Sequence, residues 1–251
     1  MIESLPLAVT QITTQCGDRH LTDATGFFFE RDGALFLVTS RHVVLDEPSG
    51  HRPDRIGINL HVNAQNLAET AHCSIALYHQ GQALWREGSD QAGPIDVIAL
   101  PLNRALLPPK LLFHAFRPEQ LYRKLDLVEM GASVLIVGFP LGVHDTLHHL
   151  PVARQAVVAS SFGIRFQGRG CFLTDARLHR GTSGAPVVAR MSVPGDGRRD
   201  FPWMLLGVHT ARLDLADRDA SQDESLDLNF AWYADILLTL TGSQGAVHGR
   251  S

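Results

Sequence analysis

Short runs of apolar residues, separated by turn residues, recur along this chain. Residues 27–30 and 35–38 flank Asp32-Gly33, a dipeptide typical of a two-residue hairpin turn. Residues 56–62 alternate apolar and polar positions, which is the period-two pattern of a half-buried strand. Further apolar runs of strand length occupy residues 74–78, 83–85, 134–137, 156–159, 187–190 and 204–208. We therefore expect an all-β protein.

The segments between these runs predict the connections. Residues 101–124 hold four prolines and are expected to join the two halves of the chain. A Gly/Pro/Arg-rich stretch at 193–199 predicts a loop, and the acidic stretch 214–227 predicts a mobile loop. Residues 232–241 have the amphipathic pattern of a closing helix, followed by a frayed tail.

Length and composition limit the class of protein. The chain has 251 residues, 45% of them hydrophobic, which suits one large or two small globular domains. Its formal net charge of −4 lacks the basic excess of nucleic-acid-binding proteins. No apolar run approaches the roughly 18 residues needed to span a membrane. We expect neither nucleic acid nor a membrane as a partner.

The N-terminus and the cysteines favour a cytoplasmic location. The first seven residues lack the basic start and the long apolar core of a secretory signal. Cys16, Cys73 and Cys171 are odd in number and widely spaced, so a disulfide framework is not expected. Free thiols in a reducing compartment follow from this pattern.

The segment Gly181-Thr182-Ser183-Gly184 carries the most specific chemistry. Its glycines permit a sharp turn and the close approach of a substrate carbonyl. The backbone N–H groups of Gly181 and Ser183 could then converge to stabilise an oxyanion. Ser183 is therefore a candidate nucleophile, although an ordinary turn is the alternative interpretation of this segment alone.

Two upstream residues complete a candidate catalytic triad. His42 follows an apolar run and precedes two valines, so we expect it at a strand end, fixed by its neighbours as a general base. Asp96 stands within an apolar run, where an unpaired carboxylate would be costly, and the Nδ1–H of His42 is its natural partner. Asp46, Asp54 and Asp90 are nearby in sequence but outside such a run. Each residue alone could be structural; together they predict the triad.

These motifs resemble those of trypsin-like serine peptidases with the chymotrypsin fold, of the single-domain bacterial kind. The resemblance runs from about residue 9 to residue 240. It rests on five segments: the hairpin and histidine motif at 25–43, the aspartate motif at 96–100, the opening of a second barrel at 137–154, the serine region at 172–184 and the pocket strand at 206–211. The serine region is also similar to the catalytic domain of HtrA-type heat-shock proteases.

The resemblance implies two six-stranded antiparallel Greek-key β-barrels with a C-terminal helix. The first barrel, residues 1–120, would carry the histidine and the aspartate. The second barrel, residues 121–242, would carry the serine and the closing helix, and residues 243–251 would form a flexible tail. The implied activity is that of a serine endopeptidase that hydrolyses peptide bonds through an acyl-enzyme, without a cofactor.

Departures from the family pattern concern the serine motif. Thr182 replaces an aspartate that pairs with a newly cut N-terminus in the trypsin branch, so we expect no activation by zymogen cleavage. Arg180 stands where related bacterial chains often have proline, and Ala156 where many have glycine on a pocket strand.

Four residues are candidates for binding the substrate: Arg177, Arg180, His209 and Thr210. A histidine at the position matching His209 contacts an acidic side chain in glutamyl endopeptidases. A preference for an acidic residue or Gln before the scissile bond is therefore a hypothesis. The alternatives are that His209 supports the barrel core and that Arg177 points to solvent.

A histidine-rich segment is a candidate metal-binding site. His144, Asp145, His148 and His149 lie close together in sequence. We expect a surface loop rimming the cleft and no metal, because a zinc site needs well-placed ligands with supporting partners.

Two rival classes stay open beside the endopeptidase. One is a catalytically silent or partner-gated pseudo-protease that binds peptides, and the other is an esterase or acyl-transferring enzyme with the same triad. Besides a protein or peptide substrate, we expect a regulatory protein partner, as for a processing or defence effector.

Overall fold

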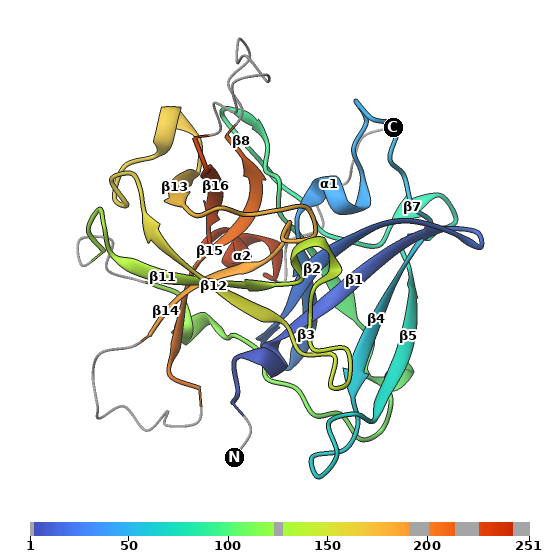
Figure 1. The fold of residues 1–251 in the computed structure, drawn as a ribbon. Coiled ribbons are helices and arrows are strands. Elements are labelled where there is room, and N and C mark those ends of the chain that lie inside the picture. Colours follow the sequence, from blue (N-terminus) through green and yellow to red (C-terminus); the bar gives the residue numbers. More distant parts are fainter. Residues whose placement is uncertain (1–2, 123–127, 191–200, 214–225, 243–251) are drawn as a thin grey trace, which may run out of the picture.

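A computed structural model describes residues 3–122, 128–190, 201–213 and 226–242 of the chain. Its strands form two large antiparallel sheets that lie side by side (Figure 1). The fold class is confirmed as all-β, with one closed barrel and one open, half-barrel sheet in the arrangement of the chymotrypsin fold. No helix within the described ranges is long and apolar enough to cross a membrane.

The first sheet contains six strands in the order β10-β3-β2-β1-β4-β5. Their bounds are β1 Val9–Cys16, β2 Arg19–Arg31, β3 Ala34–Thr39, β4 Arg55–His61, β5 Thr70–Ala76 and β10 Ile98–Leu102. The turn between β2 and β3 has positive φ at both Asp32 (51°) and Gly33 (79°). This is the backbone geometry that the Asp-Gly dipeptide predicts for a tight hairpin.

The first sheet stays open rather than closing into the predicted full barrel. Its edges are β10 and β5, and no described strand pairs them with each other. Between them the chain forms two short hairpins, β6 Tyr78–His79 with β7 Gln82–Ala83 and β8 Ser89–Asp90 with β9 Gly93–Pro94. Residues of β5 are exposed or half-buried throughout, as suits an edge strand.

The second sheet is a closed barrel in the order β11-β12-β13-β16-β15-β14. The bounds are β11 Ser133–Gly138, β12 Val152–Val158, β13 Cys171–Asp175, β14 Pro186–Arg190, β15 Trp203–Arg212 and β16 Leu228–Tyr233. Pairing of β11 with β14 closes the barrel. The serine turn lies between β13 and β14, so both strands anchor it.

Helices are few and short in the described part of the chain. The α-helices are α1 Arg41–Val44 and α2 Ile236–Leu240, and the 3-10 turns are η1 Pro6–Ala8, η2 Arg104–Leu106, η3 Pro118–Gln120, η5 Pro140–Gly142 and η6 Phe166–Gly168. The closing helix is shorter than predicted, because Trp232 pairs with Cys171 and Val208 in the barrel. The loop predicted at 193–199, the tail 243–251 and most of the loop predicted at 214–227 lie outside the described residues.

One buried apolar cluster joins the two sheets. Phe27 and Phe36 of the first sheet, Val137 and Val208 of the barrel, and Phe116 of the connection all belong to it. The ring of Phe116 meets Phe27 edge-on, with centroids 5.6 Å apart. Burial of such side chains stabilises a fold by about 1.5–3 kcal/mol each. This shared core fixes the sheets relative to each other, and with them the cleft between them.

Candidate active site

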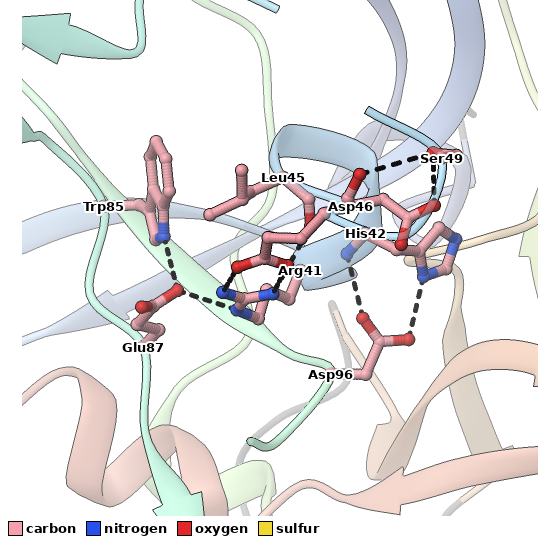
Figure 2. Close-up of polar contacts among 9 residues, drawn as sticks. Arg41, His42, Leu45, Asp46, Ser49, Trp85, Glu87 and Asp96 are labelled. Atoms are coloured by element: carbon pink, nitrogen blue, oxygen red, sulfur yellow. Dashed lines mark hydrogen bonds and ion pairs between the residues drawn. The ribbon is translucent and has the colours of Figure 1, made fainter. Parts of the chain in front are cut away.

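His42 and Asp96 form a two-point hydrogen-bonded pair beside the first sheet (Figure 2). The His42 Nδ1–H donates to Asp96 Oδ2 at 2.8 Å, and the His42 backbone N–H donates to Asp96 Oδ1 at 2.9 Å. Both carboxylate oxygens are engaged, so the imidazole is fixed in orientation. Because Nδ1 is taken, Nε2 is the ring nitrogen available for proton transfer.

The secondary structure around this pair differs from the sequence expectation. His42 lies on the one-turn helix α1 that follows β3, not at the end of a strand. Asp96 lies just before β10, not within a strand. Pairing of β10 with β3 (Ile98 opposite Thr39) nevertheless brings the two residues together.

The local charges favour the protonated form of His42. Burial by itself lowers the pKa of His42, but the hydrogen bond and charge of Asp96, with the charge of Asp46, outweigh it. The pKa of His42 is therefore raised above its ordinary value. An imidazole of this kind is a stronger base than a free histidine, and 37% of its side chain stays exposed to the cleft.

Ion pairs hold helix α1 in place. Arg41 Nε donates to Glu87 at 3.0 Å, and its terminal nitrogens donate to both carboxylate oxygens of Glu47 at 2.8 and 3.0 Å. Trp85 Nε1 donates to the same Glu87 oxygen at 3.0 Å (Figure 2). The hydrogen bond from Arg41 lowers the pKa of Glu47 to about 2. These contacts fasten the residue next to His42 to the chain that leads to Asp96.

Glycines on both sides of Ser183 are required by the turn. Gly181 has φ +91° and Gly184 has φ +86°, a region that favours glycine. A Cβ on Gly181 would lie 2.4 Å from the carbonyl oxygen of Phe139, and one on Gly184 would lie 2.2 Å from that of Thr25. The predicted sharp turn therefore also packs tightly against its neighbours.

The peptide bond before Gly181 is oriented by Leu141. The Leu141 N–H donates to the Arg180 carbonyl at 2.6 Å. In a trans peptide the carbonyl and the following N–H point in opposite directions, so the Gly181 N–H faces away from Leu141. Within the described part of the chain, neither the Gly181 N–H nor the Ser183 N–H donates a hydrogen bond. Both are free donors on the serine turn, and an oxyanion hole requires such donors.

Thr25 is a positioning residue that sequence reasoning missed. Its side chain is fully buried, donates to the Gly181 carbonyl at 2.7 Å and accepts from the Phe139 N–H at 3.1 Å. Its backbone N–H donates to the Ser183 carbonyl at 2.9 Å. The signal was a threonine shortly before the apolar run 27–29 of a strand, because a hydroxyl buried there needs a partner.

Ser183 and His42 line the same cleft, a hollow of about 540 Å³ that also includes Arg180 and Gly181. The Ser183 hydroxyl donates to the Thr210 carbonyl at 3.1 Å. No described contact is a hydrogen bond between Ser183 and His42. Catalytic hydrogen bonds are often long before substrate binds, so this arrangement is compatible with proton transfer after a rotation of the serine side chain.

The candidate substrate-binding residues are placed differently from one another. Arg180 lines the cleft, whereas Arg177 is exposed and is not among the cleft residues. His209 is only 3% exposed, and burial followed by the charge of His42 lowers its pKa to about 3. His209 is thus neutral, and its Nδ1 has no hydrogen-bond partner among the described residues. Thr210 follows it on β15.

The histidine-rich segment 144–149 makes separate local contacts. His148 pairs with Asp145 at 2.7 Å, and His144 Nδ1 lies 2.6 Å from the Gly142 carbonyl. His149 stacks on His144, with centroids 5.7 Å apart. Among described residues, no three His, Cys, Asp or Glu side chains are grouped to hold a metal ion.

Comparisons with known proteins bear on the family and the fold. The trypsin-like peptidase domain matches residues 24–192. The serine endoprotease from Yersinia pestis has a TM-score of 0.52 at 14% identity, over 92% of this chain and 60% of that chain. The active form of a protease from M. tuberculosis has a TM-score of 0.50 at 17% identity, over 98% and 84%. At these identities the likeness shows a shared fold. No curated protein sequence matches the chain.

Proposed function

This chain belongs to the trypsin-like peptidase family, and from that premise we propose that it is a serine endopeptidase in which Ser183, His42 and Asp96 act as the catalytic triad. The observation that carries the proposal is the two-point hydrogen bonding of Asp96 to His42 in the cleft that contains Ser183. The two free N–H groups of the serine turn support it. The chain spans 60% of the length of the Yersinia protein, so the activity assigned here is that of the domain alone.

The proposed reaction begins when the Ser183 hydroxyl leaves the Thr210 carbonyl and gives its proton to His42 Nε2. The oxygen attacks the carbonyl carbon of a substrate peptide bond, and the N–H groups of Gly181 and Ser183 stabilise the resulting oxyanion. His42 then returns the proton to the leaving amine as the C–N bond breaks. A water molecule, deprotonated by His42, hydrolyses the acyl-enzyme. Each oxyanion donor typically contributes about 3–4 kcal/mol to the barrier reduction.

We further propose that the primary pocket prefers an acidic residue or Gln. The support is the buried Nδ1 of His209, which has no partner among the described residues. A neutral imidazole that carries a proton on this nitrogen can donate to a carboxylate or an amide oxygen. Profiling of His209→Asn against a peptide library tests this proposal, and an unchanged preference for the residue before the scissile bond would overturn it.

A partner-gated peptide-binding protein is the second candidate. The observation in its favour is that the Ser183 hydroxyl donates to Thr210 rather than to His42. Cleavage of an unstructured protein, followed by mass spectrometry of the products, separates the two candidates. The endopeptidase predicts internal cleavage by the wild type and none by Ser183→Ala or His42→Ala. Absence of cleavage by all three proteins, each correctly folded, would favour the gated protein.

A further inference from the structure

A second hollow adjoins the catalytic cleft at Leu141. We name it the flank groove. Its volume is about 490 Å³, and it lies between the turn η5, strand β12 and His179, which is two residues before the serine turn. Leu141 lines both the flank groove and the catalytic cleft. A ligand that occupies the cleft can therefore continue into the groove without leaving the surface.

Exposed apolar side chains form part of the lining of the flank groove. Leu141 is 66% exposed and Val143 is 58% exposed, and both side chains line the groove. Val152 of β12 adds a third apolar side chain. Exposed apolar side chains gathered beside a binding site commonly mark a surface that is covered when a ligand binds.

The charged groups of the flank groove are all cationic or basic. Arg154 of β12 and His179 line it, and no Asp or Glu does so among the residues described. Within the described ranges, no ion pair or side-chain hydrogen bond involves Arg154 or the His179 ring. Asp145, the acidic residue of the adjoining loop, is paired with His148 instead. A guanidinium stays charged at all physiological pH and matches the geometry of a carboxylate.

The position of the cleft indicates which part of a substrate reaches this groove. The cleft is lined by His42, Val43 and Asp46, with no described residue of β15. In the proposed reaction His42 delivers a proton to the leaving amine, so the substrate chain after the scissile bond lies on the His42 side. That chain, extended at about 3.3 Å per residue, would run through the cleft toward Leu141.

We propose that the flank groove binds the segment of the substrate that follows the scissile bond and selects a segment with an apolar residue next to an Asp or Glu. The apolar residue would cover Leu141 and Val143, and the carboxylate would bind Arg154. His179 would add a second donor. This inference rests on the proposed endopeptidase function, because it takes the substrate's own chain as the occupant.

Binding to Ser183→Ala tests the groove independently of catalysis. Fluorescence anisotropy would compare labelled hexapeptides with a free N-terminus that carry Glu, Gln or Lys at one position at a time. We expect Glu to bind roughly tenfold more tightly than Gln at one position, as one charge-assisted hydrogen bond implies. When Arg154→Glu is added to Ser183→Ala, the protein should bind the Lys peptide more tightly than the Glu peptide. The control Arg165→Ala removes an exposed arginine outside the groove and should leave the preference for Glu unchanged. Equal binding of Glu, Gln and Lys at every position would overturn the proposal.

A kinetic experiment separates failure of the groove from failure of the proposed function. Internally quenched peptides with Glu or Gln after the scissile bond report on the groove through kcat/KM. A fluorophosphonate probe, which carries no such segment, reports on Ser183 alone. Probe labelling with no Glu preference would contradict the groove and leave the endopeptidase intact. Absence of both labelling and cleavage would contradict the endopeptidase, and the anisotropy measurement would then decide on the groove.

Discussion

Replacement of Thr25 by valine removes one buried hydroxyl that supports the serine turn. The hydroxyl links the Gly181 carbonyl to the Phe139 N–H, at 2.7 and 3.1 Å. Valine has nearly the same shape, so the packing of β2 is retained while both hydrogen bonds are lost. The backbone N–H of residue 25 still donates to the Ser183 carbonyl. The substitution therefore tests the side chain alone.

The expected magnitude follows from the two groups left without a partner. An unsatisfied buried polar group costs about 1–3 kcal/mol, and partial relaxation of the turn would reduce the sum for two groups to about 2–3 kcal/mol. If this free energy is lost from the orientation of Gly181, the oxyanion hole is less well formed in the transition state. At 1.36 kcal/mol per factor of ten, kcat should fall roughly 30- to 150-fold.

The assay is steady-state hydrolysis of a peptide substrate, together with thermal unfolding. Thr25→Val should lower kcat with little change in KM, because the turn acts on the transition state more than on substrate binding. Thr25→Ser keeps the hydroxyl and should retain most of the activity. The reasoning would be refuted if Thr25→Val kept full kcat, or if Thr25→Ser were as impaired as Thr25→Val.

Three further predictions concern the turn, the base and the core. Gly181→Ala should abolish hydrolysis while secondary structure by circular dichroism persists, because its Cβ would meet the Phe139 carbonyl at 2.4 Å. In the pH profile of kcat/KM, the midpoint of the acidic limb should lie above the pKa of a free histidine, because His42 must be neutral to act as a base and its pKa is raised. Asp96→Asn removes the charge that raises this pKa and should move the limb to lower pH. Phe116→Ala should reduce the free energy of unfolding by about 3–5 kcal/mol in denaturant titrations, because this fully buried ring joins the two sheets.

Each of these outcomes has a contradicting result. Near-normal activity of Gly181→Ala would show that the turn can shift to accommodate a Cβ. A pH profile that Asp96→Asn leaves unchanged would show that Asp96 does not raise the pKa of the catalytic base. A loss below about 1 kcal/mol for Phe116→Ala would show that the shared core does not depend on this ring.

Local sequence patterns were sufficient for features that depend on neighbouring residues. The Asp32-Gly33 hairpin follows from the two positive φ angles that this dipeptide tolerates. The pairing of Asp96 with His42 could be predicted because a carboxylate in an apolar run needs a partner. The helix α1, which contains His42, could not be predicted, because four residues are too few to give a helical period.

Features that depend on contacts between distant parts of the chain could not be predicted from the sequence. The hydroxyl of Thr25 acts on Gly181, more than 150 positions away, and only the packing of the two sheets brings them together. The open edge of the first sheet depends on how the chain from Tyr78 to Pro94 folds back on itself in two small hairpins. The flank groove combines η5, β12 and His179, which share no sequence pattern.

Intact-mass analysis after exposure to a fluorophosphonate probe tests the proposed triad most directly. An activated serine displaces fluoride and gains one phosphonyl group. The proposal predicts a single adduct on the wild type and none on Ser183→Ala. The Asp96→Asn variant should be labelled more slowly than the wild type. An unlabelled wild type that is correctly folded, or equal labelling of Ser183→Ala, would contradict the assignment of Ser183 as the nucleophile.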